Sequence, residues 1–559
     1  MRPIGSLTGE WDMDLQRIVF AGAVALGASI GIASAQEVKP QYGGELIFAQ
    51  AGEQFSLFPG RNLDSAAQDV WLNACENLVE MTEDSSIVPA LAKSWTISPD
   101  KKIFTFQLQE GVKFHDGTPF NAEAVAFVYN EAKAKTFIYA TILEGFDMAK
   151  AESEHVVSLR FRAPFAALLP NLAYRPLCIF SPTAYQKNGE QWMATHIVGT
   201  GPFIQKEFIK GEHIRFEKNP NYWQKGKPYL DAIKIITVPD PAVRAALLEK
   251  GEIDRTVSLN DFDVPRLEAN KNLRLRVVPS TRQYYVALNH MVPALAHVNV
   301  RKALNYAIDK TGIVKSVFAD RGAILATAPT MTEGVFGYAD MRKPGEDTIF
   351  PYDLARARLL LKNAGYEDRN KDGFVEDVKG TKLSLNLFTR RGGTKGDFQI
   401  AQLVQAFLKE IGVEVRITVL ESAAFGDAIK LGPTDAKYDL ALLSWGIPTA
   451  DPDEPMMLFT LTQAWKPVGA NRMFYSSEEV DRLSWLAHTE TDEAKRKDYV
   501  KLWMAELLRD APVIYLPTLA LNLGSRSYLH GDRILAVDNF PASFSWLDKE
   551  EMKRQGIRR

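Results

Sequence analysis

The sequence predicts an α/β protein, because segments with the two-residue period of strands alternate with segments that have helical periodicity. The clearest case starts with a strand over residues 382–388, which is followed by a helix over residues 397–410. Gly412 ends that helix, and residues 413–419 then alternate strictly between apolar and polar side chains, as a strand does. Strands joined by a helix in this way run parallel, so we expect a mostly parallel sheet.

The N-terminal residues 1–35 have the pattern of a secretory signal peptide. A basic residue precedes an apolar run over residues 18–32, and residues 33–35 read Ala-Ser-Ala, the small-x-small pattern that signal peptidase cleaves. The mature chain is therefore expected to begin near Gln36. Acidic residues ahead of the apolar run are unusual in such a leader, so Met13 is an alternative start.

The apolar run of this leader has about fifteen residues, whereas a helix needs about 20 to cross a bilayer. No second long apolar run follows, so we expect an exported protein. A lipoprotein would carry a cysteine at the cleavage point, but the cysteines are Cys75 and Cys178, and we therefore expect a periplasmic protein without a lipid anchor. Two unpaired buried thiols are the simpler expectation for these cysteines, and a disulfide is the alternative.

The balance of charge excludes one class of partner. Lysine and arginine number 66 and the acidic residues 69, so the formal net charge is −3. A chain without a basic excess has no field that would attract nucleic acid. We therefore expect no nucleic-acid partner.

Residues 88–128 predict a hairpin followed by a helix. Residues 95–97 and 103–108 read as strands around a turn, and the second strand alternates apolar side chains onto one face. Asn121 can then cap a helix whose apolar residues share a face. Farther along, Asp240 caps a second helix that glycine ends.

Six motifs in a fixed order resemble one family. They are residues 88–128, Gly199–Phe203, Asn219–Trp223, Gly251–Asp254, Asn305–Lys310 and Tyr438–Trp445. In this order they resemble the peptide/nickel/opine-type extracellular solute-binding proteins, which deliver ligands to ABC importers.

This resemblance implies the two-lobed periplasmic-binding-protein fold, in which two α/β lobes close about a hinge. Lobe I would span residues 36–280 with an inserted subdomain at about 71–198. Lobe II would span residues 281–515, and residues 516–559 would return to lobe I. A ligand would bind in the crevice beyond the carboxyl ends of the strands, and binding would close the hinge.

The resemblance also implies ligand-binding residues. Arg175 stands where the nickel branch has an arginine that holds the carboxylate of a metal chelate, and the alternative is a surface or salt-bridged arginine. Tyr139 stands where that branch has a stacking tryptophan, but the second arginine of the branch is replaced by Thr136. This replacement argues against a strict nickel-chelate site.

Two further residues come from the peptide-binding branch of the family. Arg391 stands where an arginine contacts peptide carboxylates, and the alternative is a solvated loop charge. Trp445 would stack against the ligand, and the alternative is a core tryptophan. An aspartate three residues beyond this tryptophan pairs with the ligand's amine in peptide binders, but Pro448 stands there, while Asp451 is expected to shape the turn. Ordinary dipeptide recognition is therefore not expected.

Enzyme and metal motifs are absent from the sequence. It contains no HExxH pair, no phosphate-binding glycine loop and no Gly-x-Ser-x-Gly elbow, so we expect neither catalytic residues nor a cofactor. Residues 368–373 open like a calcium loop, but Lys379 occupies the position that needs a bidentate glutamate, so no calcium site is expected. Residues 451–475 contain no histidine, so no direct metal ligand is expected there.

These observations together predict the periplasmic substrate-binding component of an ABC importer, a monomer whose partners are its ligand and the membrane permease. The ligand would be a compact anionic or zwitterionic solute: a short peptide, an opine-like conjugate or a metal chelate. A ligand-sensing or chaperone-like binding protein is the first alternative, and a secreted hydrolase is the second.

Overall fold

The computed structural model describes most of the chain. The described residues are 39–52, 56–61, 65–137, 142–143, 145–391, 395–461, 470–534 and 541–558, without the side chains of Ser65 and Arg391. The helices and strands among them lie in the unit Pro40–Arg559. The predicted signal peptide and the start near Gln36 lie outside the described residues.

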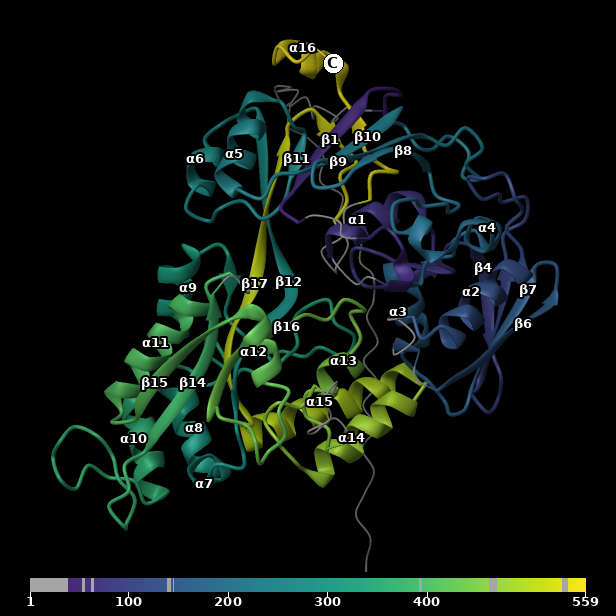
Figure 1. The fold of residues 1–559 in the computed structure, drawn as a ribbon. Coiled ribbons are helices and arrows are strands. Elements are labelled where there is room, and N and C mark those ends of the chain that lie inside the picture. Colours follow the sequence, from purple (N-terminus) through teal and green to yellow (C-terminus); the bar gives the residue numbers. More distant parts are fainter. Residues whose placement is uncertain are drawn as a thin grey trace, which may run out of the picture. The chain divides into compact units, whose positions relative to one another are not determined.

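A sheet of 11 strands dominates this unit (Figure 1). Its strands are β1 (Glu45–Gln50), β8 (Phe203–Ile209), β9 (His213–Lys218), β10 (Ala232–Thr237), β11 (Arg255–Thr256), β12 (Leu273–Leu288), β13 (Ala323–Ile324), β14 (Ser384–Arg391), β15 (Glu414–Glu421), β16 (Leu440–Trp445) and β17 (Val513–Arg526). Their hydrogen-bonded order is β15-β14-β16-β12-β17-β11-β1-β10-β9-β8, with β13 beside β17.

The sheet is mixed. β14 runs parallel to β15 and β16, and β1 runs parallel to β10 and β11. The long strands β12 and β17 pair antiparallel with each other, and β8, β9 and β10 form an antiparallel meander. The expectation of a mostly parallel sheet is therefore wrong for the whole sheet, although the β14-to-β15 unit on which it rested is confirmed.

The helices are α1 (Ser65–Ala74), α2 (Ala122–Ala134), α3 (Leu168–Ala173), α4 (Pro182–Met193), α5 (Pro241–Lys250), α6 (Val264–Glu268), α7 (Pro293–Ala296), α8 (Val298–Tyr306), α9 (Lys310–Phe318), α10 (Leu354–Asn363), α11 (Asp397–Glu410), α12 (Ser422–Ala428), α13 (Asp453–Met456), α14 (Glu478–Thr489), α15 (Glu493–Asp510) and α16 (Lys549–Arg554), with 3-10 turns η1 (Pro59–Arg61) and η3 (Arg175–Leu177). None of the helices in the described ranges has the length and hydropathy needed to span a bilayer.

The predicted hairpin and helix in the segment 88–128 are confirmed. A four-stranded sheet has the order β4-β5-β7-β6, and its strands are β4 (Ala92–Ile97), β5 (Ile103–Leu108), β6 (Phe146–Ser153) and β7 (Val156–Phe161). Asn121 accepts a hydrogen bond from the Ala124 N–H and so caps α2. Asp240 caps α5 in the same way, and Gly251 ends α5 with a left-handed backbone.

Two short strand pairs and one helix–sheet contact complete the description. β2 (Val79–Met81) pairs with β3 (Ile87–Pro89), and β18 (Leu529–His530) pairs with β19 (Trp546–Leu547). α2 packs against β6 of the four-stranded sheet.

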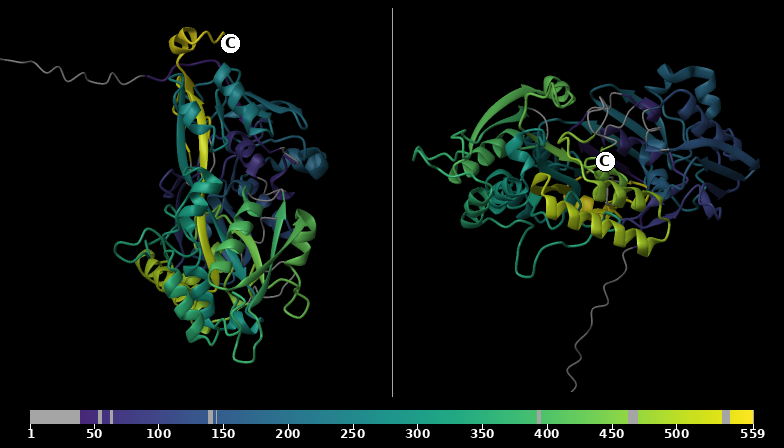
Figure 2. Two further views of the ribbon diagram at one scale, coloured as in Figure 1. Left: turned by 90° about the vertical axis from the view of Figure 1, so that its left-hand side faces the viewer. Right: turned by 90° about the horizontal axis from the view of Figure 1, so that it is seen from below.

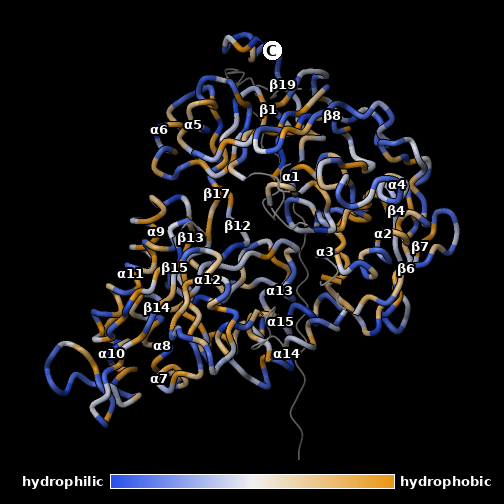
Figure 3. Tube along the Cα trace, in the orientation of Figure 1, coloured by the Kyte–Doolittle hydropathy of each residue, from blue (hydrophilic) through white to orange (hydrophobic). Residues whose placement is uncertain are grey.

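Two large hydrophobic cores lie in this unit beside two small clusters, and we call the large ones the first core and the second core. The first takes its buried residues mainly from the segment 46–235, and the second from the segment 284–519. β12 and β17 lie side by side and connect them (Figures 1 and 2), since Val278 packs against the first core while Tyr284 lies in the second. β17 is buried along nearly all of its length and is largely hydrophobic (Figure 3).

The pairing of β12 with β17 is irregular where the strands pass from one core to the other. Its register shifts between Pro279 and Gln283. A shift of this kind locally weakens the ladder of hydrogen bonds and bends the strand. Bending between the two cores would therefore occur most readily at this place.

Two of the motifs converge on Glu76, directly after α1. Its carboxylate accepts hydrogen bonds from the Thr200 hydroxyl at 2.7 Å, the Tyr222 hydroxyl at 2.8 Å and the Trp223 indole N–H at 3.0 Å. Burial raises the pKa of Glu76 to about 7, and these three donors act in the opposite direction. The motifs around Thr200 and Trp223 therefore hold the first core together.

Asp254 and Asn305 have similar structural roles in their own motifs. Asp254 is fully buried and accepts hydrogen bonds from the Ile47 N–H and the Tyr528 hydroxyl, both at 2.6 Å. Asn305 accepts a hydrogen bond from the Tyr515 N–H at 3.0 Å and donates one to the Val513 carbonyl, both in β17. Each side chain joins segments far apart in the sequence, so these motifs record the scaffold.

Cys75 and Cys178 form a disulfide, with their Cα atoms 5.6 Å apart. The simpler expectation of two unpaired thiols is therefore wrong. Their separation of 103 positions in the sequence hid the pairing, because proximity over such a separation is a property of the tertiary fold. The disulfide joins the end of α1 to the end of η3, next to Glu76.

Candidate functional site

Parallel strands β14 and β16 end at the same edge of the sheet. Leu387 pairs with Leu440 and Phe388 with Ala441, so Arg391 and Trp445 both lie at carboxyl ends along that edge. The carboxyl edge of parallel strands is where open α/β sheets bind ligands. The structure thus brings these two predicted residues to one edge, although the side chain of Arg391 lies outside the described part.

Trp445 has an indole N–H for which the described part of the chain offers no acceptor. Its ring is partly buried and packs against the second core, and Nε1 is buried with no hydrogen-bond partner among the described residues. Gln283 stands opposite Trp445 on β12, is 1 % exposed, and its Oε1 likewise lacks a donor within that part of the chain. Buried polar groups left unpaired cost about 1–3 kcal/mol each, so their clustering singles out this edge.

The loop that follows Trp445 packs against both cores. Ile447 and Met456 belong to the second core, whereas Ala450 belongs to the first. The Ile447 N–H donates to the Thr281 hydroxyl at 3.1 Å, in the irregular part of β12. A change in the relative position of the cores would therefore alter the contacts of this loop.

Arg282 lies in the same irregular part of β12. Its guanidinium donates to the Ser444 hydroxyl at 3.4 Å and packs so closely on Gly446 that a Cβ there would lie 3.0 Å from Nη2. Arg282 is exposed and has no carboxylate within 4.0 Å in the described ranges. It is an available cation next to the loop.

The acidic residues Asp451 and Asp453 have side-chain partners within the protein. Arg496 of α15 contacts both oxygens of buried Asp451 at 2.7 Å and reaches Asp453 at 3.2 Å. His488 of α14 also contacts Asp453, at 2.7 Å. The Asp453 N–H donates to Asp451, which therefore shapes the turn as predicted.

Glu454 differs from its two acidic neighbours. Its carboxylate accepts a hydrogen bond from the Thr449 hydroxyl at 3.1 Å, and no lysine, arginine or histidine lies within 4.0 Å in the part of the chain that the structure describes. Burial raises the pKa of Glu454 to about 8, and the negative charges of Asp451 and Asp453 act in the same direction.

Tyr174 approaches this loop from the first core. It lies between α3 and η3, and its hydroxyl accepts a hydrogen bond from Gln68 of α1 at 3.4 Å. Burial raises the pKa of Tyr174, and the charge of Glu454 raises it further. The carboxylate of Glu454 and the hydroxyl of Tyr174 are therefore close enough for their charges to interact.

Contacts between segments of the two cores surround this region. The Ala166 N–H donates to the His488 carbonyl at 2.9 Å, and Lys101 pairs with Glu490 at 3.2 Å. Lys395 pairs with Asp261 at 2.5 Å. These contacts join segments that are far apart in the sequence.

Arg175, the first predicted ligand arginine, is engaged inside the protein. It is 4 % exposed, and its Nη2 lies 3.3 Å from a Glu80 oxygen. Burial lowers the pKa of Arg175, while the charges of Glu80, Glu76 and Asp69 oppose that effect. This arrangement is the salt-bridged alternative, and contact with a ligand stays a prediction. Tyr139 lies outside the described residues.

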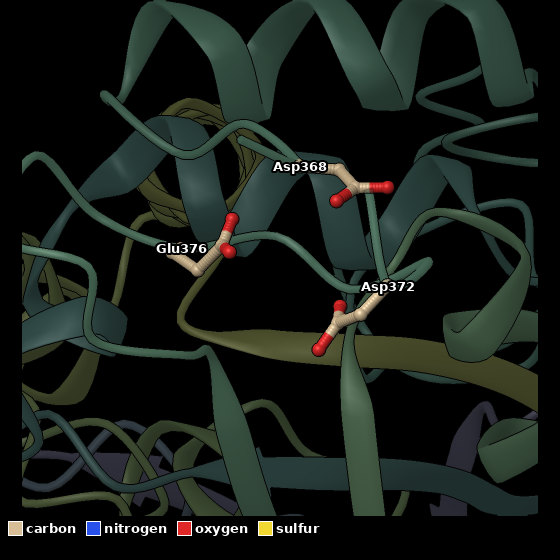
Figure 4. A group of neighbouring side chains, drawn as sticks. All are labelled: Asp368, Asp372 and Glu376. Carbon is tan, nitrogen blue, oxygen red and sulfur yellow. The ribbon is translucent and has the colours of Figure 1, made fainter. Parts of the chain in front are cut away.

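The acidic loop between α10 and β14 does not strengthen the case for a cation site. Asp368, Asp372 and Glu376 lie near one another (Figure 4), with oxygens within 4.8 Å. Asp372 already pairs with Lys382 at 2.9 Å, and Glu376 accepts the Arg369 N–H at 2.9 Å. Asp368 accepts the Gly373 N–H at 3.1 Å, so contacts within the loop account for all three carboxylates.

A cavity of about 470 Å³ lies elsewhere in the first core's segment. Residues from α4, β8 and their surroundings line it, including Trp192, His196 and Lys206. None of the predicted ligand residues is among those that line it.

A family model supplies the deciding comparison. The model of the bacterial extracellular solute-binding proteins, family 5 middle region, matches residues 86–467. The chain belongs to family 5 of the extracellular solute-binding proteins. It is therefore a substrate-binding protein of the kind that serves ABC importers, as the resemblance predicted.

Several known proteins align with nearly the whole length of this family 5 protein. The glutathione-binding protein GsiB of Pectobacterium atrosepticum is 30% identical over 508 residues, which cover 90% of this chain and 94% of GsiB. The ABC transporter-associated periplasmic binding protein DppA of Helicobacter pylori was solved with the peptide STSA. It is 26% identical with a TM-score of 0.74, and the match covers 91% of this chain and 99% of DppA. NikZ of Campylobacter jejuni, solved with Ni(L-His), is 25% identical with a TM-score of 0.73, and the match covers 89% of this chain and 96% of NikZ. The predicted two-lobed α/β fold is thus confirmed.

Arg282, Tyr174 and Glu454 were missed by the sequence prediction. Arg282 lies in a polar stretch, residues 280–283, between two more apolar parts of a long strand, which is a weak signal for an edge or a bulge. Glu454 belongs to an acidic run, Asp-Pro-Asp-Glu, in which only the tertiary partners Arg496 and His488 show which acids are neutralised. No local pattern distinguishes Tyr174 from a core tyrosine.

Proposed function

We propose that this family 5 protein captures a compact, zwitterionic, peptide-like solute between its two cores and delivers it to an ABC permease. The observation that carries the proposal is the loop from Trp445 to Glu454. It leaves the carboxyl edge of the sheet, packs against both cores and adjoins the irregular part of β12. A ligand bound there would contact both halves of the protein at once.

The class of ligand is supported by the relatives and by the chemistry of the edge. The relative at 30% identity is named for glutathione, a peptide-like zwitterion, and DppA was solved with a peptide. At the edge, Arg282 has no carboxylate within 4.0 Å among the described residues and could hold one through its planar fork. Arg391 lies at the same edge by register, and we propose it as a second carboxylate reader.

Aromatic residues would complete the recognition. We propose that Trp445 stacks on the solute and donates its unpaired N–H to it, because a buried indole N–H usually has an acceptor. We also propose that Tyr139 contacts the solute. For Arg175 we propose a contact through its remaining N–H groups while Glu80 stays paired.

Closure would follow a hinge in β12 and β17. We propose lobe I as residues 36–280 with 516–559, with its inserted subdomain at about 71–198, and lobe II as residues 281–515. The register shift between Pro279 and Gln283 falls at that boundary and supports it. A hinge needs only a few residues that absorb the change in backbone angles.

The remaining features follow from the family role. We propose that the protein is exported by its N-terminal signal peptide, carries no lipid anchor and acts in the periplasm as a monomer. We also propose that it binds its solute without covalent chemistry, and that the second partner is the permease.

A thermal-shift and calorimetry panel tests this proposal. Reduced glutathione, a tripeptide, agropinic acid and nickel–histidine would each be titrated into the mature protein. We expect a saturable 1:1 heat with glutathione or the tripeptide, and about 2.7 kcal/mol of added stability at 100 times the dissociation constant. Binding of nickel–histidine alone, or of none of the four, would contradict the proposed class of ligand.

A further inference from the structure

The cavity of about 470 Å³ in the first core's segment is separate from the proposed solute site. Its size falls within the range of about 300–1,000 Å³ that is usual for small-molecule sites. It is lined by the turn at residues 115–116, by the segment 192–198 at the end of α4, and by the segment 204–210 along and just after β8. Neither Arg282 nor any residue of the loop 445–454 lines it, so a ligand bound here would not occupy the solute site.

One wall of the cavity is aromatic. The rings of Trp192 and His196 stack in parallel, with their centroids 4.0 Å apart and their planes 5° apart. His196 Nδ1 lies 3.0 Å from the Trp192 carbonyl oxygen and 2.9 Å from the Thr195 hydroxyl, and these contacts hold the ring in place. Phe208 also lines the cavity, and it packs against the first core as Trp192 does. Rings held in this way offer a planar solute a large apolar contact at a low cost in side-chain entropy.

Two exposed lysines bring positive charge to the cavity. Lys206 lies in β8, and Lys210 follows directly after the strand. Lys206 pairs only loosely with Glu217, at 3.9 Å, and Lys210 has no carboxylate within 4.0 Å in the described part of the chain. Both ammonium groups are therefore available to an anion.

The turn that completes the lining adds a hydrogen-bond acceptor. Asp116 is the one acid among the lining residues, and its oxygens already accept hydrogen bonds from the Thr118 and Ser181 hydroxyls. His115 donates from Nε2 to the Gly201 carbonyl at 2.9 Å, and burial lowers its pKa to about 4, so the ring is neutral near pH 7. Its Nδ1 is then an acceptor, which is buried and has no donor within the described ranges. A buried acceptor without a donor costs about 1–3 kcal/mol, and an N–H of a bound solute would offset that cost.

We propose that this cavity is a second binding site, specific for a planar aromatic carboxylate that carries a ring N–H. The ring would lie against Trp192 and Phe208, the carboxylate would lie between Lys206 and Lys210, and the N–H would pair with His115. Charge-assisted hydrogen bonds from the two ammonium groups would favour the anion, because they are about twice as strong as neutral ones. The site shares no residue with the proposed solute site, so the two ligands should bind independently.

Calorimetry with four probes tests this class of ligand on the mature protein. Indole-3-acetate has the ring, the charge and the N–H, whereas indole-3-ethanol lacks the charge, 1-methylindole-3-acetate lacks the N–H, and acetate lacks the ring. We expect saturable 1:1 binding of indole-3-acetate and no saturable binding of acetate. Binding should be at least tenfold weaker for indole-3-ethanol and about fivefold weaker for the methylated probe.

Two double variants test where the anion binds. Lys206→Gln with Lys210→Gln should weaken the binding of indole-3-acetate at least tenfold, to the level of indole-3-ethanol. The matched control is Lys225→Gln with Lys250→Gln, two exposed lysines of which Lys250 has a carboxylate partner at 3.9 Å, as Lys206 has. The control should bind indole-3-acetate within about twofold of the native protein. Thermal unfolding without ligand should match the native protein in both variants, because all four lysines are exposed.

Four results would overturn the inference. Absence of saturable binding of indole-3-acetate would remove the site, and equal binding of indole-3-ethanol or of the methylated probe would overturn the proposed class of ligand. An unchanged affinity in the variant at residues 206 and 210 would place the anion elsewhere. Displacement of indole-3-acetate by reduced glutathione would place it in the solute site. Failure of glutathione itself to bind bears on the proposed function alone, since this inference does not depend on it.

Discussion

Glu76 and Glu454 are the same type of residue in two regions with different tasks. Burial raises the pKa of both, to about 7 and about 8. Three donors from two motifs surround Glu76, whereas among the described residues the Thr449 hydroxyl is the one side-chain donor to Glu454. The first region is a completed network that fixes the scaffold, and the second holds a carboxyl group with a single side-chain donor among the described residues, in the loop that leaves the sheet's carboxyl edge. Saturation of polar groups thus separates structural motifs from recognition sites.

The largest effect is expected in the scaffold, from loss of the disulfide next to Glu76. Replacing Cys75 and Cys178 by serine should lower the free energy of unfolding by about 4 kcal/mol, because the bridge closes a long loop in the unfolded chain. Denaturant unfolding would measure this loss. Ligand affinity of the folded variant should stay within about twofold of native, and a large loss of affinity would place this region in the recognition site.

Removal of Glu76 should be the next most damaging change. Glu76→Ala leaves the Thr200, Tyr222 and Trp223 donors without their acceptor, so we expect a loss of about 3 kcal/mol in unfolding free energy. Glu454→Gln, measured in the same urea titration, should change stability by less than about 1 kcal/mol. The comparison fails if both variants are destabilised equally.

The pH dependence of stability should report Glu454 without any ligand. Its folded-state pKa of about 8 lies above the ordinary glutamate value, so the folded protein binds this proton more tightly than the unfolded chain does. Stability from this group is therefore present below about pH 4.5 and is lost as pH rises toward 8, by at most about 1.4 kcal/mol per pH unit. Glu454→Gln should flatten this part of the stability profile, and an unchanged slope would show that Glu454 titrates normally.

The smallest expected effect concerns the indole of Trp445. Trp445→Phe keeps an aromatic ring against the second core and removes an N–H that has no protein acceptor among the described residues. Unfolding free energy should change by less than about 1 kcal/mol, whereas glutathione affinity should fall about fivefold to tenfold. Calorimetry separates the two quantities, and a stability loss without a loss of affinity would make Trp445 a core residue only.

The scaffold could be predicted from sequence because local rules dictate it. Asn121 and Asp240 cap their helices as expected, and the strand–helix–strand unit after residue 382 forms with the expected parallel pairing. The sheet as a whole is mixed because long antiparallel strands connect the cores, and pairing between segments more than 200 residues apart leaves no local pattern.

The site could be predicted only in outline. The motif ending at Trp445 and the strand ending at Arg391 were found, and the register brings both to one edge. The availability of Glu454 and the pairing of Arg175 with Glu80 depend on side chains that only the folded protein brings together. Which charges are neutralised internally is therefore a tertiary property.

Hydrogen exchange with and without reduced glutathione tests the central claim most directly. The account predicts slower exchange in residues 445–454 and around the register shift at residues 279–283 when ligand is bound, with little change in residues 199–223 around Glu76. Protection confined to residues 199–223, or no change in residues 445–454 at saturating ligand, would contradict it.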